Sequence, residues 1–151
     1  MTQPVVSIRP VEDDDLSILY AYQSDPVAAA MAVFPIRTLD AFLEHWATIR
    51  ASATGTVRTV LADDVVVGNI MTWTHDGERE VGYWIGREHW GRGYATQALR
   101  LLLAEVADRP IMARIALDNL GSQRVVEHCG FVRVGEVVAD DGVHEAIYRL
   151  D

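Results

Sequence analysis

Two hydrophobic periodicities alternate along the chain, and this alternation limits the folds open to it more than any other feature. Apolar residues recur at every second position in some segments and at helical spacing in others. Such alternation is typical of α/β proteins with a mixed sheet. Turns at 63–64, 76–77 and 141–142, each containing aspartate, join neighbouring strands as hairpins. We expect strands at 5–9, 57–62, 65–73, 80–86, 111–117, 131–138 and 144–150.

Helical spacing marks the other segments. The acids at 12–15 suit the positive N-terminal end of a helix that begins near Leu16, and Asp40 is the expected cap of a second helix. The proline-containing stretch 25–39 predicts a loop between them, and Pro110 stops the third helix. We expect helices at 16–23, 40–49, 93–107 and 119–129, which gives the order β-α-α-β-β-β-α-β-α-β-β in a single domain, 1–151.

The charge balance argues against two classes of function. The 151 residues include 13 basic and 22 acidic ones, a net charge of −9 with neutral histidines. Such a chain is poorly suited to neutralising nucleic-acid phosphates or an anionic membrane surface, so we expect neither partner. The absence of a signal pattern and of a long apolar run predicts a cytoplasmic protein. Cys129 is the only cysteine, and the histidines lack ligand spacing, so we expect no metal.

The segment 84–99, WIGREHWGRGYATQAL, joins a strand to a helix through Gly91 and Gly93. Glycine permits backbone angles that turn successive N–H groups inward, and the new helix adds unpaired N–H groups and its positive dipole end. Arg92 supplies a positive charge and Thr96 a hydroxyl. The segment therefore predicts an anion cradle suited to a pyrophosphate, although such turns also occur purely for tight packing.

Two other phosphate-binding motifs match the sequence poorly. A P-loop ends in Gly-Lys-Ser/Thr, and the chain contains no such triplet. The dinucleotide fingerprint needs a third small residue where Thr96 stands, and its βαβ unit normally opens a domain. A nucleotide-dependent oxidoreductase is therefore a poor second interpretation.

The segment 90–95, WGRGYA, resembles the acetyl-CoA loop of the GNAT superfamily of N-acetyltransferases, Gln/Arg-x-x-Gly-x-Gly/Ala, and matches it at the fourth and sixth positions. Trp90 replaces the usual Gln or Arg. That departure, together with GYW at 82–84, resembles the ribosomal-protein N-terminal acetyltransferase branch. The stretch 118–131, DNLGSQRVVEHCGF, is similar to the Asn-x-x-Ser-x-x-Val pattern of that branch, which ends in Gly-Phe. The resemblance spans essentially the whole chain.

The resemblance implies transfer of an acetyl group from acetyl-CoA to a primary amine of a small molecule or a peptide N-terminus. It implies a mixed, mostly antiparallel sheet of about seven strands with about four helices. Strands 80–86 and 111–117 are expected to start side by side and then splay, and CoA to sit in the opening with its pantetheine arm along 83–85. The implied cofactor residues are Tyr83, Trp84, Ile85, Gly91, Arg92, Gly93, Tyr94, Ala95, Thr96, Asn119 and Ser122.

The resemblance also proposes catalytic roles. Glu80 is the candidate base, acting directly or through water; the alternative is a solvated charge after a hairpin. Val126 occupies the position where many members carry a tyrosine acid, so Ser122 is the candidate substitute; the alternative is a helix hydroxyl bonded to a nearby carbonyl. Tyr83 is a weaker candidate acid. A CoA-binding or sensing module without turnover remains the alternative function.

In the family, segments corresponding to 25–39 and 138–144 wall the acceptor site. Phe34 and Glu80 are the expected acceptor-binding residues, and the acids of the 138–144 turn, Asp140 and Asp141, are expected to attract a cationic amine. The tryptophans leave room for a homodimer interface as well as for a core.

Overall fold

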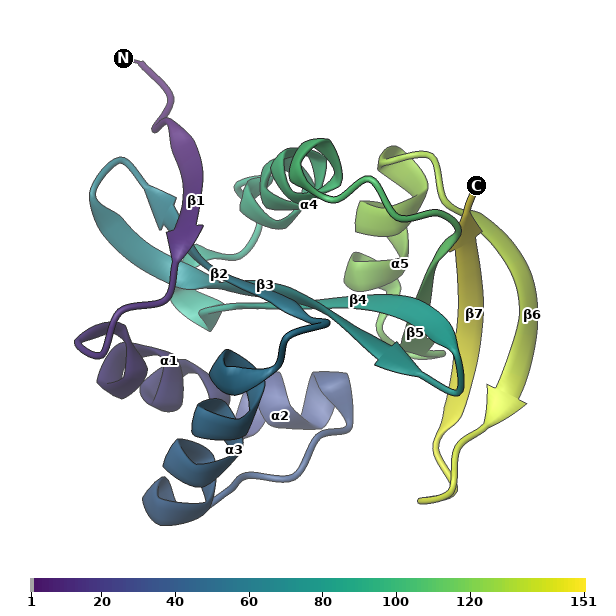
Figure 1. Cartoon of the computed structure of the whole chain (residues 1–151), viewed down its shortest axis with the longest axis horizontal. Coiled ribbons are helices and arrows are strands. Elements are labelled where there is room, and N and C mark those ends of the chain that lie inside the picture. The colour runs from purple at the N-terminus through teal and green to yellow at the C-terminus, as the bar shows by residue number, and fades with distance from the viewer. Residues whose placement is uncertain (1) are drawn as a thin grey trace.

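A computed structural model describes residues 2–151. Its strands form one sheet of seven in the order β1-β2-β3-β4-β5-β7-β6 (Figure 1). Only β4 and β5 run parallel, so the predicted mixed and mostly antiparallel sheet is confirmed. The strands are β1 (Val6–Pro10), β2 (Thr56–Ala62), β3 (Val65–His75), β4 (Glu78–Ile85), β5 (Ile111–Ala116), β6 (Val132–Val138) and β7 (His144–Leu150).

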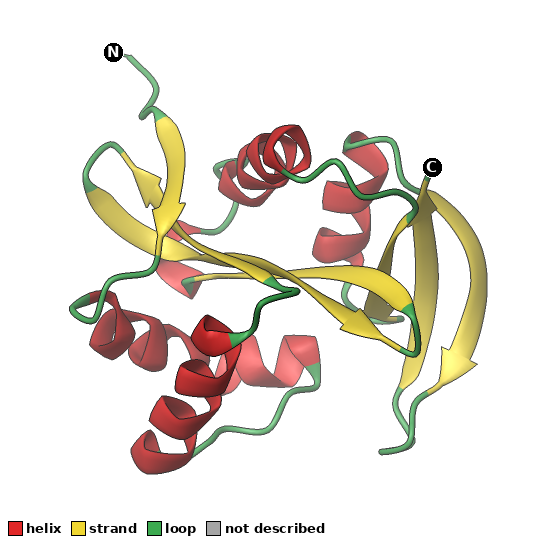
Figure 2. Cartoon of the chain, in the orientation of Figure 1, coloured by secondary structure: helices red, strands yellow, loops and turns green. Residues whose placement is uncertain are grey.

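Helices cover both faces of the sheet. One face carries α1 to α3, and the other carries α4 and α5 (Figures 1 and 2). Among the described residues, no helix has the length and apolar character needed to cross a membrane. The helices are α1 (Asp15–Gln23), α2 (Pro26–Ala32), α3 (Leu39–Ala51), α4 (Tyr94–Glu105) and α5 (Leu120–His128), with a short 3₁₀ turn, η1, at Arg87–His89.

Helix α2 corrects the predicted loop at 25–39 and brings the α-helices to five. The side chain of Asp25 accepts hydrogen bonds from the N–H groups of Val27 and Ala28, at 2.8 and 3.2 Å. Pro26 occupies the first helical turn, where a proline has no N–H bond to lose. The cap of α3 is also corrected, because Thr38, not Asp40, accepts the N–H of Ala41.

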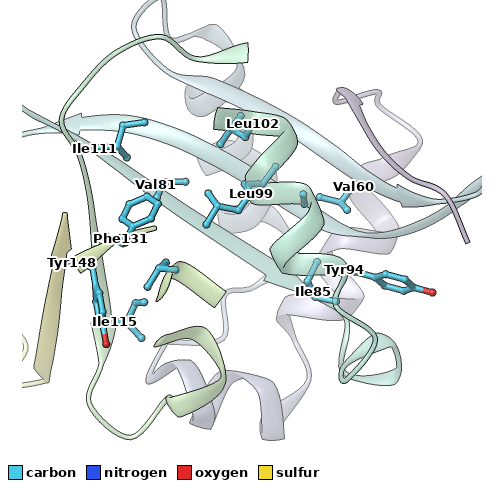
Figure 3. Close-up of a cluster of buried hydrophobic side chains, with 14 of the residues drawn as sticks. Val60, Val81, Ile85, Tyr94, Leu99, Leu102, Ile111, Ile115, Phe131 and Tyr148 are labelled. Atoms are coloured by element: carbon cyan, nitrogen blue, oxygen red, sulfur yellow. The ribbon is translucent and has the colours of Figure 1, made fainter. Parts of the chain in front are cut away.

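Each face of the sheet has its own hydrophobic cluster. Under α4, Leu99 and Leu102 are fully buried against the central strands (Figure 3). Under α1 and α3, Leu19, Phe42 and Trp46 form the second cluster. Burying one such side chain stabilises the fold by about 2 kcal/mol. Trp46 is 1% exposed, so it belongs to the core and not to a surface.

The parallel contact between β4 and β5 is short. Its register pairs only Arg79 with Ile111 and Glu80 with Met112. Strand β5 stays paired with β7 along its whole length, whereas β4 continues beside β3 to Ile85. The predicted splaying of these two strands is therefore confirmed, and it leaves the later part of β4 with an open edge.

A buried carboxylate ties α1 to the sheet. Asp15 is 3% exposed and accepts hydrogen bonds from both terminal nitrogens of Arg9, at 2.7 and 3.0 Å. The N–H of Glu12 and the hydroxyl of Thr59 also donate to it, at 2.8 and 2.7 Å. Burial opposes ionisation, but these donors prevail and lower the pKa of Asp15 from 3.8 to about 2.

Asp15 should therefore make folding stability depend on acid pH. Since its folded-state pKa lies below the unfolded value, its contribution is complete above about pH 4 and is lost as the pH falls toward 2. We expect a loss of about 2 kcal/mol over that interval in urea unfolding. In Asp15→Asn this loss should disappear along with much of the stability. The exposed neighbour variant Asp14→Asn should keep the wild-type profile; an unchanged profile in Asp15→Asn would contradict the assignment.

Candidate functional site

Two cavities meet where β4 leaves β5. One, of about 500 Å³, extends along the start of α4 and the side of α5. The other, of about 350 Å³, lies over the sheet beneath the segment that follows α2 and is walled by α3. The residues shared by the two linings are Ala32, Tyr83, Trp84, Asn119 and Ser122. A molecule in one cavity can therefore contact a molecule in the other at this junction.

The first cavity ends at the glycine loop before α4. Gly91 and Gly93 have φ of +76° and +79°, a backbone region that favours glycine. Within the described residues, the backbone N–H groups from Gly91 through Thr96 have no protein acceptor. Unpaired N–H groups at the start of a 12-residue helix, with the helix dipole behind them, favour an anion. The loop thus has the character of the predicted cradle.

Trp90 has a structural role that its sequence position alone does not reveal. Its indole Nε1–H donates to the carbonyl of Ile85 at 2.8 Å. This bond crosses η1 and fixes the loop against the end of β4. The residue that departs from the family pattern therefore braces the cradle instead of leaving it loose.

Backbone groups of β4 face the opening. Antiparallel strands alternate between pairs that exchange hydrogen bonds and pairs that do not. The N–H of Gly86 donates to the carbonyl of Val67 at 2.9 Å, so the adjacent pair, Ile85 with Gly68, exchanges none. Ile85 and, by alternation, Tyr83 therefore direct their backbone groups away from β3, toward the gap. The carbonyl of Ile85 already accepts the indole N–H of Trp90. The N–H groups of Tyr83 and Ile85 and the carbonyl of Tyr83 are therefore the backbone groups available to a ligand in the gap.

The start of α5 forms the opposite wall of the junction. The Asn119 side chain caps α5 by accepting the N–H of Ser122 at 3.3 Å. The hydroxyl of Tyr83 donates to the carbonyl of Ser122 at 2.9 Å, and burial raises the pKa of Tyr83, so the phenol stays protonated. Within the described chain, the Ser122 hydroxyl itself has no hydrogen-bond partner, and the alternative of a hydroxyl held by a nearby carbonyl does not apply.

Glu80 lies in the second cavity and is 4% exposed, so its interpretation as a solvated charge is wrong. Arg114 approaches it from β5, with Nε 3.6 Å from the carboxylate. Burial raises the pKa of Glu80 in spite of this guanidinium, and Glu145 adds to the rise. The second cavity thus contains a carboxylate that takes up a proton more readily than an ordinary glutamate.

Aromatic side chains enclose the same cavity. Phe34 follows α2 and packs edge-on against Trp84, with ring centres 5.8 Å apart. The guanidinium of Arg37 lies 5.0 Å from the Phe34 ring centre. The expected acids of the 138–144 turn are not in the lining: Asp141 caps its own turn by accepting the N–H of Val143, and Glu145 lines the cavity instead.

Sequence reasoning missed several polar lining residues of the second cavity, among them Asn69, Arg114 and His45. Asn69 and Arg114 are polar residues within apolar strands, a signal that marks them as unusual without saying which cavity they face. His45 stands one residue before the buried Trp46 on α3, and burial lowers its pKa, with Arg37 adding to the effect.

The fold and site define an α/β protein whose splayed strands separate a helix start with unpaired N–H groups from a buried carboxylate. The chain belongs to the acetyltransferase (GNAT) domain family, whose model matches residues 6–132. It is 25% identical over 143 residues to the uncharacterized N-acetyltransferase p20 of Bacillus licheniformis, covering 86% of this chain and 80% of that protein. It is 30% identical over 95 residues to the probable N-acetyltransferase YjcK of Bacillus subtilis, covering 60% and 49%.

Solved structures show the same fold. Aminoglycoside acetyltransferase AAC(6')-Ib in complex with coenzyme A superimposes with a TM-score of 0.82 at 19% identity, covering 97% of this chain and 94% of that one. RimJ of Mycobacterium smegmatis in complex with CoA-disulfide gives a TM-score of 0.79 at 22% identity, covering 97% and 82%. An acetyltransferase of the GNAT family from Bacillus anthracis gives 0.82 at 20% identity, covering 99% and 96%.

The buried carboxylate of Glu80 should lower stability at neutral pH. Because its folded-state pKa lies above the ordinary 4.5, the unfolded chain ionises first as the pH rises. Glu80→Gln should therefore be more stable than the wild type in urea unfolding at pH 8 and about equal to it at pH 4. The exposed carboxylate variant Glu44→Gln, on α3 and outside both cavities, should show no such gain. A loss of stability at pH 8 in Glu80→Gln would mean that Arg114 outweighs burial.

Proposed function

We propose that this protein is an acetyl-CoA-dependent N-acetyltransferase that moves the acetyl group directly to a primary amine. The observation that carries the proposal is the meeting of two cavities at the gap between β4 and α5. One contains a row of unpaired N–H groups and the other a buried carboxylate. An acyl donor and an amine held in the two cavities are brought together, which supplies much of the acceleration.

Acetyl-CoA supplies an acetyl group already activated as a thioester. Its pyrophosphate would bind the N–H groups of Gly91, Arg92, Gly93, Tyr94, Ala95 and Thr96, with the side chain of Arg92 as the nearby cation. Its pantetheine amides would pair with the open edge of β4 through the backbone of Tyr83 and Ile85. Trp84 would line the same space, with Asn119 and Ser122 opposite. Family members of the same fold that were solved with coenzyme A support this assignment.

The residues at the junction match the needs of acetyl transfer. Glu80 accepts the proton of the amine, directly or through water, and a raised pKa suits a carboxylate to that task. A backbone N–H of β4 stabilises the negative charge that develops on the acetyl oxygen. The new C–N bond forms as the C–S bond breaks, and Ser122 donates a hydrogen bond to the departing sulfur.

The branch of the family and the class of acceptor are proposed from sequence motifs and from a solved structure of the same fold. The GYW and WGRGYAT phrases favour the ribosomal-protein branch. Kanamycin bound to AAC(6')-Ib, a structure of the same fold, supports a small-molecule amine as acceptor, and a peptide N-terminus is the second candidate. Phe34 and Glu80 would contact that acceptor. A cytoplasmic location and a homodimer stay predictions from the sequence.

Thiol release from acetyl-CoA over a panel of primary amines tests the proposal. We expect turnover with at least one amine, and Glu80→Gln should lower kcat/KM for that amine by about 100-fold at neutral pH. The KM for acetyl-CoA should stay within about twofold, because Glu80 lies in the other cavity. The acid limb of the kcat/KM profile should also disappear in this variant.

Glu44→Gln is the matched control, since Glu44 is an exposed carboxylate on α3, outside both cavities, and should behave as wild type. Wild-type turnover in Glu80→Gln would remove Glu80 as the base. Tight CoA binding with no thiol release from any amine would favour the sensing module over the enzyme.

A further inference from the structure

Asn69 differs from the other buried polar side chains of the described residues in its hydrogen bonding. The residue is 2% exposed, and its Nδ2 is the one buried side-chain polar atom without a hydrogen-bond partner among residues 2–151. A buried donor without a partner costs free energy, and such groups in folded proteins call for an explanation. An apolar residue at this position would avoid that cost.

The neighbours of Asn69 across the sheet are satisfied. On β2, Thr59 faces it and donates its hydroxyl to Asp15 at 2.7 Å. On β4, Trp84 faces it and donates its indole N–H to the carbonyl of Tyr22 at 3.1 Å. The register therefore turns all three side chains toward α1 to α3, and only the amide of Asn69 has no protein acceptor.

Asn69 lines the second cavity, in which the acceptor is proposed to bind. Glu80 and the indole of Trp73 line the same space, and Trp73 lies over Gly82, where an added Cβ would come within 2.7 Å of its ring. Since protein supplies no acceptor for Nδ2, a molecule that fills the cavity can supply one. That acceptor must be an oxygen or a similar lone-pair group, because Nδ2 only donates.

The charges of this cavity balance. Its charged lining consists of the carboxylates of Glu80 and Glu145 and the guanidiniums of Arg37 and Arg114. The pKa of His45 is lowered by partial burial and by Arg37, which favours the neutral imidazole. One ammonium can be stabilised beside the carboxylates, but each further positive charge on the same molecule approaches a guanidinium. The lining therefore suits a single cation better than a polycation.

We propose that Asn69 is a specificity-determining residue that donates a hydrogen bond to an oxygen of the acceptor, and that the acceptor is a singly charged primary amine bearing a carbonyl or hydroxyl group. This inference rests on the proposed acetyl transfer and narrows its substrate class. It separates this cavity from one built for polycationic aminoglycosides such as kanamycin.

The test compares acceptors that share one carbon skeleton. L-leucinamide carries a carbonyl, L-leucinol a hydroxyl, and 4-methylpentan-2-amine a methyl group in their place. Asn69→Leu should lower the ratio of kcat/KM between an oxygenated amine and the methyl analogue by about 10-fold relative to wild type. Comparing ratios between proteins cancels the different basicities of the amines. If the ratio falls for leucinamide, the oxygen that Asn69 recognises is a carbonyl; if it falls for leucinol, that oxygen is a hydroxyl.

Stability provides a second readout. Removing an unpaired buried amide should leave the Tm of Asn69→Leu unchanged or raise it by roughly 2–4 °C. Thr74→Val, on the same strand but exposed, is the control and should keep the wild-type ratios. Asn69→Ala serves if the leucine does not fit, since it removes the amide without adding volume.

Two results would overturn the proposal: ratios within twofold of wild type in both Asn69 variants for both oxygenated amines, or a kcat/KM for kanamycin above that for leucinamide. Absence of thiol release from every amine would instead reject the proposed function. In that case, the role of Asn69 in binding is tested by the Tm shift that leucinamide produces in the CoA-loaded protein. The proposal requires a shift that exceeds the shift with the methyl analogue and that is lost in Asn69→Leu.

Discussion

The short parallel contact between β4 and β5 is the constraint on which the site depends. Because the two strands pair only at their beginnings, the open edge of β4 and the start of α5 face each other across a gap. Beyond that contact each strand follows its other neighbour, β5 along β7 and β4 along β3. Both cavities and their junction follow from this divergence.

Backbone groups provide the positive potential of one cavity, whereas charged side chains determine the electrostatics of the other. The chain is acidic, with a net charge of −9, yet the proposed cradle needs few basic residues because N–H groups and a helix dipole supply the positive potential. The cavity over the sheet is organised differently. There, burial raises the pKa of Glu80 and makes it a stronger base, while the nearby guanidinium of Arg114 partly stabilises the ionised carboxylate.

The sequence predicts the parts of this site that depend on local chemistry. Gly91 and Gly93 could be identified because a positive φ is specified by residue type, and their angles agree. Helix α2 was missed because Pro26 resembles a loop signal until Asp25 is seen to cap the helix. The positions of Asn69 and Arg114 at the second cavity could not be predicted without the register between strands, since alternation alone does not say which polar group lines which cavity.

The central claim, that the loop before α4 is the CoA-binding cradle, is tested most directly by calorimetric titration with acetyl-CoA. Gly93 and Gly77 share a φ of +79° and open surroundings, so a glutamate imposes the same backbone strain at both, but only at Gly93 does it put a carboxylate in the cradle. We predict that Gly93→Glu weakens binding by about 100-fold while Gly77→Glu binds as wild type. Equal affinity in the two variants, or no binding by the wild type, would contradict the account.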